Sequence, residues 1–280
     1  MTLEQTVARH YGSEDLLARI DDALRKAGVD PDHPTIDDLK PVDEFHTGGI
    51  EATTALLDQL TIEPGMQVLD VGCGLGGTAR HILHRYGAHV TGVDLTPEFV
   101  ETGRAINHRL GLDEGIDLHE GSATELPVED GQVDLVTMFH VGMNLPDKAP
   151  LFSEAARVLK PGGHFALFDV MRGENPEDLT YPLPWAGMPE TSNVDAPDVY
   201  RRAAHAAGLH PVTERDRHQF AIDYFARVFR KIAAEGPPPV GIHLLMGDTA
   251  SEKLKNYLAN VEAGRTIPME MIFIKPQALP

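Results

Sequence analysis

The chain has 280 residues, a formal net charge of −19, and contents of 42% hydrophobic and 24% charged residues. These values are ordinary for a globular protein, with room for one large α/β domain with additions or for two small domains. The strong negative charge argues against nucleic acid as the main partner, because phosphate binding needs basic patches. No stretch approaches the roughly 20 apolar residues of a membrane-crossing helix, so we expect no membrane insertion.

The N-terminal residues and the cysteine content bear on the cellular compartment. The segment Met1–Gln5 has neither the basic nor the apolar region of a signal peptide. One cysteine cannot form an intramolecular disulfide, and it fits a reducing compartment. We therefore expect a cytoplasmic protein that acts on a small molecule, and a homo-oligomer is left open.

Residues 1–44 are predicted to form an N-terminal helical cap. Ser13 is a suitable cap for a helix with apolar residues at helical spacing, and Gly28 ends that helix. The chain is then expected to break at its prolines, which are Pro31, Pro34 and Pro41. A further helix is predicted from about Ile50 to Leu60.

Short apolar runs alternate with helical patterns over the next hundred residues. The predicted strands are Val68–Val71, His89–Asp94, Ile116–Glu120, Val133–Phe139 and His164–Val170. The alternation predicts a mostly parallel sheet with right-handed crossovers. Two more strands are expected, near His210–Glu214 and at Met269–Ile274.

The rhythm changes after Met171. Residues 172–197 are rich in proline, contain Trp185, and predict a long irregular loop of the kind that forms lids and binding segments. Residues 218–264 are predicted to be helical, with a break at the prolines that follow Gly236. We therefore expect one domain over residues 45–280 that carries both segments as lid insertions.

The glycine-rich stretch after the first predicted strand suggests a nucleoside ligand. Gly72, Gly74 and Gly77 fit the spacing of a dinucleotide-binding turn, which alone is a weak signal. Asp70 stands two residues before the first glycine, where a carboxylate suits a cationic ligand better than a pyrophosphate. Asp94 ends the next strand, where an acid holds ribose hydroxyls. A nucleoside with a cationic centre describes S-adenosylmethionine.

Four segments in order resemble the motifs of class I S-adenosylmethionine-dependent methyltransferases. They are VLDVGCGLGG at residues 68–77, VTGVD at 90–94, ELPVEDGQVDLV at 125–136 and EAARVLKPGGHFAL at 154–167. The chain is similar to the small-molecule group that contains ubiquinone/menaquinone C-methyltransferases, phosphoethanolamine and sarcosine/dimethylglycine N-methyltransferases and sterol methyltransferases. The resemblance implies a Rossmann-like, doubly wound, seven-stranded α/β sheet, mostly parallel with an antiparallel last strand.

The resemblance also implies cofactor contacts. Asp70, or a water that it holds, would meet the amino-acid end, while Gly72, Cys73 and Gly74 let the backbone approach the ligand. Asp94 would bind the ribose hydroxyls. The adenine would lie beside the residues Leu95, Ser122 and Ala123. Many relatives have Asp where this chain has Ser122, so the usual side-chain contact to the adenine amino group is weaker here or is made by the Ser122 hydroxyl.

Two histidines are candidate bases. His140 follows the fourth strand, where the resemblance implies that it contacts the cofactor and lines the path to the acceptor. His46 lies in a turn that resembles a family segment closing over the methionine end. A side chain that titrates near neutrality suits proton removal from an acceptor. The residues expected to contact substrate are Tyr11, Phe45, Met143, Asn144 and Trp185. No set of histidines has the spacing of a metal site, so we expect no metal.

These observations predict transfer of a methyl group from S-adenosylmethionine to a small acceptor by in-line displacement, with nitrogen or carbon as the expected target. Two alternatives remain. A nicotinamide-dependent oxidoreductase would have a purely parallel sheet, and a closing antiparallel strand would decide against it. A module that binds S-adenosylmethionine without turnover would show no activity over an acceptor panel.

Overall fold

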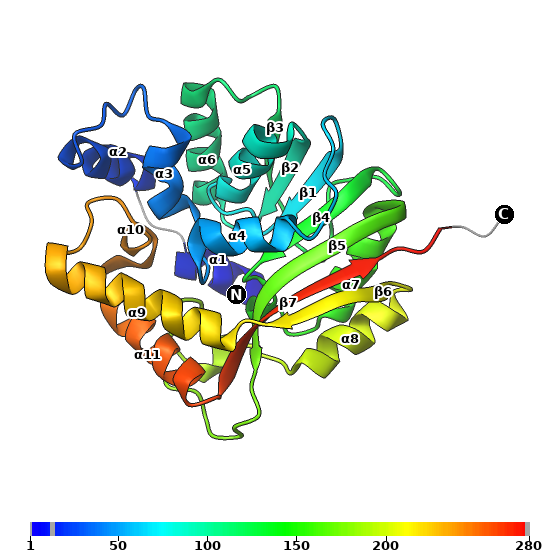
Figure 1. Ribbon diagram of the computed structural model, residues 1–280. Coiled ribbons are helices and arrows are strands. Elements are labelled where there is room, and N and C mark those ends of the chain that lie inside the picture. The colour runs from blue at the N-terminus through cyan, green and yellow to red at the C-terminus, as the bar shows by residue number, and fades with distance from the viewer. Residues whose placement is uncertain (1, 12–14, 278–280) are drawn as a thin grey trace.

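A computed structural model describes residues 2–11 and 15–277. Seven strands form one sheet in the order β3-β2-β1-β4-β5-β7-β6 (Figure 1). Their bounds are β1 Gln67–Val71, β2 His89–Asp94, β3 Ile116–Glu120, β4 Val133–Phe139, β5 Leu159–Arg172, β6 His210–Asp216 and β7 Thr266–Ile274. The first five strands pair in parallel, and β7 runs antiparallel to both β5 and β6. The predicted fold class is therefore confirmed, including the antiparallel last strand.

Eleven α-helices surround this sheet in the described residues. They are α1 Leu3–Tyr11, α2 Leu16–Lys26, α3 Ile36–Asp43, α4 Gly49–Leu57, α5 Gly77–Tyr86, α6 Pro97–Leu110, α7 Ala149–Val158, α8 Pro197–Ala206, α9 His218–Glu235, α10 His243–Met246 and α11 Ala250–Glu262. None of them is long and apolar enough to cross a membrane. Ser13, the predicted cap of α2, lies outside the described residues.

Both faces of the sheet are covered, because successive residues of a strand point to opposite sides. Leu69 of β1 packs in a core with Phe152 of α7 and Tyr200 of α8. Its neighbour Val68 packs on the other face, in a core with Ile82 of α5. This two-sided burial explains why the central strands are continuous apolar runs.

The remaining helices gather at one end of the sheet. In Figure 1, α2, α3, α9, α10 and α11 lie together on the left, while the C-terminus leaves on the right. The side chains of α2 and α3 form a core with Phe99 and Ile106 of α6. Those of α9 and α11 form another core with Trp185 and Leu183 of the loop after β5. This end therefore has walls built from elements outside the sheet.

Two predicted element boundaries were wrong. The chain does not break at Pro41, because α3 runs through it to Asp43. Thr35 and Asp38 form a reciprocal capping box at the start of this helix, and burial of Leu39 and Val42 holds its inner face. Strand β5 begins at Leu159 rather than His164, since it includes the Pro161–Gly163 segment.

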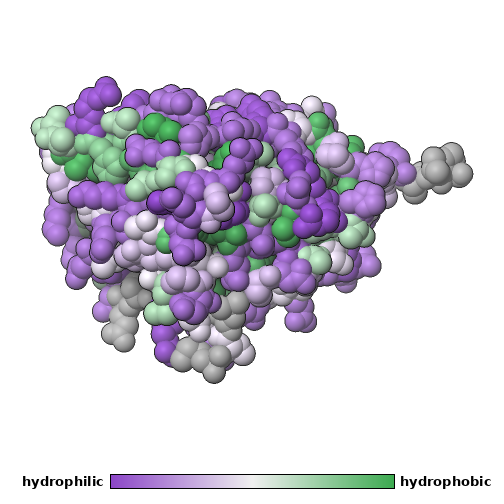
Figure 2. All heavy atoms as spheres, turned by 90° about the horizontal axis from the view of Figure 1, so that it is seen from below, coloured by the Kyte–Doolittle hydropathy of each residue, from purple (hydrophilic) through white to green (hydrophobic). Residues whose placement is uncertain are grey.

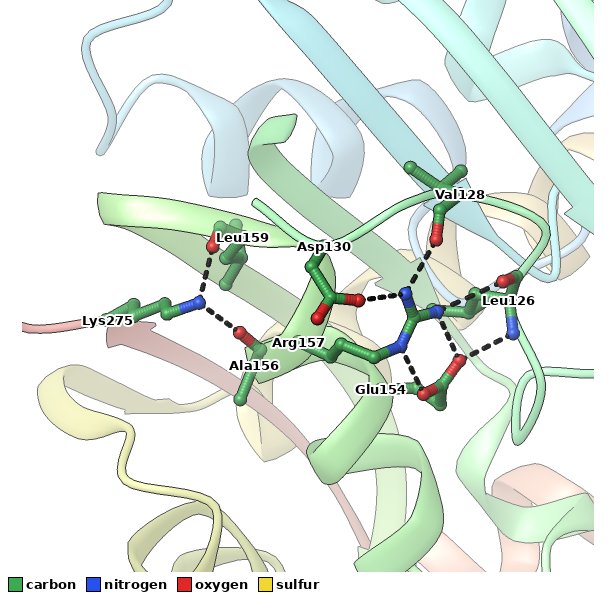
Figure 3. Close-up of polar contacts among 8 residues, drawn as sticks. All are labelled: Leu126, Val128, Asp130, Glu154, Ala156, Arg157, Leu159 and Lys275. Carbon is green, nitrogen blue, oxygen red and sulfur yellow. Dashed lines mark hydrogen bonds and ion pairs between the residues drawn. The ribbon is translucent and has the colours of Figure 1, made fainter. Parts of the chain in front are cut away.

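Arg157 of α7 fixes the segment that connects β3 with β4 (Figure 3). Its guanidinium donates to the backbone oxygens of Leu126 and Val128 and to the Asp130 carboxylate. Glu154 pairs with Arg157 and also accepts from the Leu126 N–H at 2.8 Å. Because this network is partly exposed, it adds little to the free energy of unfolding, and its main effect is to order the connecting segment.

The surface agrees with the acidic composition. Hydrophilic residues cover most of the face seen in Figure 2, and hydrophobic residues appear there in small groups. Only two large hydrophobic side chains among the described residues are strongly exposed, Met188 and Val212. This surface therefore offers no broad apolar patch in that view.

Candidate active site

A cavity of about 610 Å³ lies where β1, β2, β3 and β4 end. The turns after these strands form its floor, at the edge where open α/β sheets bind ligands. Helices α1, α9 and α11 and the loop after β5 contribute the opposite walls. The residues that the sequence placed in a site converge here: Tyr11, Phe45, His46, Gly72, Cys73, Gly74, Asp94, Leu95, Ser122, Ala123, His140, Met143, Asn144 and Trp185 all line the cavity.

The glycine turn leaves its backbone open to this cavity. Gly74 has φ +53, and a Cβ there would meet no protein atom within 4 Å. Gly72 has φ +70, and a Cβ there would lie 2.2 Å from the Val141 side chain. Glycine suits Gly72 because a side chain would clash with Val141. It suits Gly74 because the positive φ there is unfavourable for residues with a Cβ.

Asp94 fastens this turn to the end of β2. Its Oδ2 accepts from the Gly74 N–H at 2.9 Å, and its Oδ1 accepts from the Thr96 N–H at 2.8 Å. Burial raises the pKa of Asp94, while these N–H donors oppose the rise. Asp94 also lines the cavity, so a ligand there can donate to the lone pairs of its carboxylate that these donors leave free.

Asp70 does not line the cavity but lies directly behind its floor. Its Oδ1 accepts from the Thr137 hydroxyl at 2.7 Å, and its buried Oδ2 has no partner. Burial raises the pKa of Asp70 to about 7. An unpaired buried carboxylate oxygen at this depth fits a water or a ligand group that reaches it through the turn.

Ser122 and Ala123 line the end of the cavity beyond β3. The Ser122 hydroxyl donates to Glu4 of α1 at 2.6 Å, and Glu4 also lines the cavity. This contact could not be predicted from the sequence, because 118 residues separate the two partners. The N-terminal helix thus supplies an acidic side chain beside Ser122.

His140 combines an unusual backbone with an unpaired nitrogen. Its φ of +54 is one of two positive values among the described non-glycine residues. Its N–H donates to the Phe168 oxygen at 2.8 Å, which holds the backbone at the end of β4. The buried Nε2 has no hydrogen-bond partner, and burial lowers the pKa of His140 well below its ordinary value. His140 thus combines a backbone conformation that is uncommon outside glycine with a buried polar atom that lacks a partner, and its role as a base stays a prediction.

His46 instead points a nitrogen into the protein. Its Nε2 lies 3.0 Å from the Thr53 hydroxyl and 3.5 Å from Glu44. The Thr53 hydroxyl donates to Glu44 at 2.7 Å, so the three side chains form one buried cluster. Burial lowers the pKa of His46 to about 3, so its imidazole is neutral. The role of His46 as a base stays a prediction.

Glu44→Gln is expected to change how stability depends on pH. Burial raises the pKa of Glu44 to about 7, with the Thr53 hydrogen bond opposing the rise. The folded state therefore holds a proton that the unfolded state loses above pH 4.5, and the native protein loses stability as pH rises from 4.5 to 7. Glutamine cannot ionise, so the variant should gain up to about 3 kcal/mol relative to the native chain over this range. Urea unfolding of both proteins from pH 4.5 to 8 measures this difference in the free energy of unfolding. A difference that stays constant with pH would contradict the prediction.

Aromatic side chains from several elements line the same cavity, and we call the space between them the aromatic chamber. We define it by its aromatic walls, which are Tyr11, Phe139, Trp185, Tyr224, Phe225 and Tyr257. Adjacent rings of this set touch edge to face, with centroids 5.5 Å apart for Trp185 and Tyr257 and 5.6 Å for Phe225 and Tyr257. The sequence did not single out the aromatic residues of α9 and α11, because aromatic positions in amphipathic helices also fit an ordinary core.

Comparisons with known proteins agree with this arrangement. Residues 69–167 match the family described as "Methyltransferase domain". The chain is 30% identical over 197 residues to a sarcosine/dimethylglycine N-methyltransferase of Halorhodospira halochloris, covering 70% of this chain and 69% of the relative. It is 31% identical over 191 residues to a phosphoethanolamine N-methyltransferase of Triticum aestivum, covering 68% of this chain but 36% of that longer relative.

Solved structures share the fold at lower identity. A geranyl diphosphate C-methyltransferase from Streptomyces coelicolor A3(2) superposes with a TM-score of 0.72 at 19% identity, covering 98% of both chains. A putative sarcosine dimethylglycine methyltransferase from Galdieria sulphuraria gives 0.66 at 20% identity, covering 92% of this chain and 99% of that one. The chain belongs to the S-adenosylmethionine-dependent small-molecule methyltransferases.

Proposed function

We propose that this chain binds S-adenosylmethionine over the glycine turn and transfers its methyl group to a small acceptor held in the aromatic chamber. The observation that carries the proposal is a single cavity lined by both Asp94 and the His140 imidazole. Such a cavity lets two ligands meet in one enclosed space, which is what an in-line displacement requires.

The cofactor contacts follow from the geometry of the floor. The Asp94 carboxylate suits the ribose, because its remaining lone pairs can accept hydrogen bonds from the two hydroxyls. Leu95 offers an apolar surface beside the adenine. The adenine would extend toward Ser122 and Ala123. The methionine end would lie over Gly72 and Cys73, with the unpaired Oδ2 of Asp70 behind it. Burial raises the pKa of the Cys73 thiol, which makes a nucleophilic role unfavourable.

The chemistry needs little beyond positioning. The nucleophile of the acceptor forms a bond to the methyl carbon as the carbon–sulfur bond breaks, and the sulfonium becomes the neutral thioether of S-adenosylhomocysteine. The acceptor then carries one proton too many. The unpaired Nε2 of His140 is placed to take that proton, because its low pKa keeps the imidazole neutral at physiological pH.

Gly74→Ala should weaken binding of S-adenosylhomocysteine, and Gly65→Ala provides a matched control. Both glycines have positive φ, +53 and +83, and at both a Cβ would meet nothing within 4 Å. Each substitution should therefore cost about 1–2 kcal/mol of stability. At Gly74 alone, the methyl would also occupy space beside the cofactor. For Gly74→Ala we expect the Kd measured by calorimetry to rise at least about tenfold. This rise corresponds to a loss of about 1.4 kcal/mol of binding free energy when the methyl group displaces the ligand from the backbone. Equal Kd values for the two variants would contradict this placement.

Turnover separates the proposal from its alternatives. An oxidoreductase would bind a nicotinamide dinucleotide, whereas we expect calorimetry to show binding of S-adenosylmethionine and none of NADH. A panel of amine, phenol and carbon acceptors with S-adenosylhomocysteine as the measured product tests catalysis. Cofactor binding without product over the whole panel would favour a non-catalytic binding module. A cytoplasmic location and a homo-oligomer stay predictions.

A further inference from the structure

The cavity that contains the aromatic chamber has acidic side chains but no basic Lys or Arg side chain among the described lining residues. The acidic residues are Glu4, Asp43, Asp94 and Asp147. Asp43 is already neutralised by a two-pronged ion pair with Arg80 at 2.7 and 3.1 Å. No lysine or arginine lines the cavity in residues 2–11 and 15–277. The seven residues outside those ranges include neither type.

Most polar atoms of the chamber are paired with each other. The Asn144 amide donates to the Tyr11 hydroxyl at 3.1 Å, and the Thr47 and Tyr257 hydroxyls lie 2.8 Å apart. Trp185 donates its indole N–H to Ser192 at 2.9 Å. Among the residues that line the cavity, His140 keeps a buried Nε2 without a hydrogen-bond partner.

Nearby cations are engaged elsewhere. Lys253 of α11 is 8% exposed, but it does not line the cavity, and its ammonium donates to the Met246 oxygen at 3.3 Å. Arg217 lies 4.0 Å over the Phe220 ring and 3.3 Å from Glu270. An anion in the chamber would therefore be buried without a counter-ion, which is strongly unfavourable.

We infer that the methyl acceptor of this chain is an apolar molecule without a carboxylate, phosphate or diphosphate group, which reacts as a neutral nucleophile. The inference rests on the proposed function and narrows it. The acceptor named in each of the two curated relatives carries an anionic group, a carboxylate in sarcosine and dimethylglycine and a phosphate in phosphoethanolamine. The chain would thus share their chemistry of transfer but differ in the class of acceptor.

The reaction balances with this acceptor. A neutral amine, for example, attacks the methyl carbon with its lone pair, and the sulfur keeps the electrons of the broken bond. The product is first a methylammonium cation. His140 takes its proton on Nε2, which leaves a neutral amine and an imidazolium that can pass the proton to solvent. No other reactant is required.

Two dyes that differ by one sulfonate test the inference directly. N-phenyl-1-naphthylamine is neutral, and 8-anilino-1-naphthalenesulfonate adds only the anion. With S-adenosylhomocysteine bound, we expect the neutral dye to bind one to one and at least about tenfold more tightly than the sulfonate, by fluorescence titration. Equal or tighter binding of the sulfonate, or no binding of the neutral dye, would overturn the inference.

A pair of charge insertions locates the dye. Leu254 lines the cavity on α11, three residues before Tyr257, so Leu254→Arg places a cation beside the chamber. Val212→Arg places the same charge on an exposed position of β6. The first should reduce or reverse the preference for the neutral dye, while the second should leave it unchanged. An unchanged preference in a folded Leu254→Arg protein would show that the dye binds elsewhere and would overturn the inference from this chamber. The native-chain titration does not depend on either variant folding.

An activity assay with natural anionic acceptors tests the inference from the other side. We expect no S-adenosylhomocysteine above background from sarcosine, dimethylglycine or phosphoethanolamine, and no displacement of the neutral dye by them. Saturable turnover of any of the three would overturn the inference, and its loss in Lys253→Gln would identify the missed cation. Failure of the proposed function looks different, because then S-adenosylmethionine would not bind, or no acceptor of any class would give S-adenosylhomocysteine.

Discussion

Asp94→Asn is expected to raise the Kd for S-adenosylhomocysteine about 100-fold, through the loss of two charge-assisted hydrogen bonds to the ribose. The substitution keeps the size of the side chain. It also places an amide beside the N–H groups of Gly74 and Thr96, which now donate to the carboxylate. Isothermal titration calorimetry measures the affinity directly, without any acceptor.

A matched control separates this effect from a general loss of charge. Asp117 lies on the neighbouring strand β3 with a side chain that is 71% exposed. Asp117→Asn makes the same chemical change outside the cavity and should leave the Kd unchanged. An unaltered affinity in Asp94→Asn would remove the assignment of the cofactor site.

His140→Asn is expected to lower kcat about 100-fold, the lower range for loss of a general base. Asparagine tolerates the positive φ of +54 at this position, so the backbone should survive the change. Affinity for S-adenosylhomocysteine should stay within about twofold, because the proposed ribose contacts come from Asp94 and not from His140. The measurement uses the amine of highest turnover in an acceptor panel.

The pH dependence of kcat tests whether the His140 imidazole stays neutral during turnover. Burial lowers the pKa of His140 well below its usual range, so the neutral base persists as pH falls from 8 to 6. We therefore expect no loss of kcat from His140 over this interval. The exposed His33 gives the matched control His33→Asn, which should behave as the native chain. A kcat of His140→Asn equal to that of the native chain would exclude His140 as the base.

The sequence predicts the sheet well because each strand can be recognised from a short stretch of neighbouring residues. Buried parallel strands read as apolar runs, and each is followed by a turn residue such as Gly72 or Gly121. Helix α3 shows the limit of such reasoning. A proline usually ends a helix, but the capping box at Thr35 and the burial of Leu39 outweigh Pro41.

The floor of the cavity was also predictable from the sequence, but the opposite walls, which come from helices outside the sheet, were not. Gly74 and Asp94 follow consecutive strands, so parallel topology alone brings them together. Tyr224 and Tyr257 come from helices far along the chain, and nothing in their spacing distinguishes a chamber wall from a core. The Glu44–Thr53–His46 cluster was missed for a similar reason, since it forms only when the loop between α3 and α4 packs against Thr53 of α4.

A co-crystal structure with S-adenosylhomocysteine tests the central claim most directly. We expect both ribose hydroxyls to bond to Asp94, the adenine to lie against Leu95 and Ser122, and the sulfur to face the aromatic chamber and His140. The acceptor could then approach the methyl to about 3–3.5 Å. A ligand bound outside the cavity, or one whose sulfur points away from His140, would contradict the account.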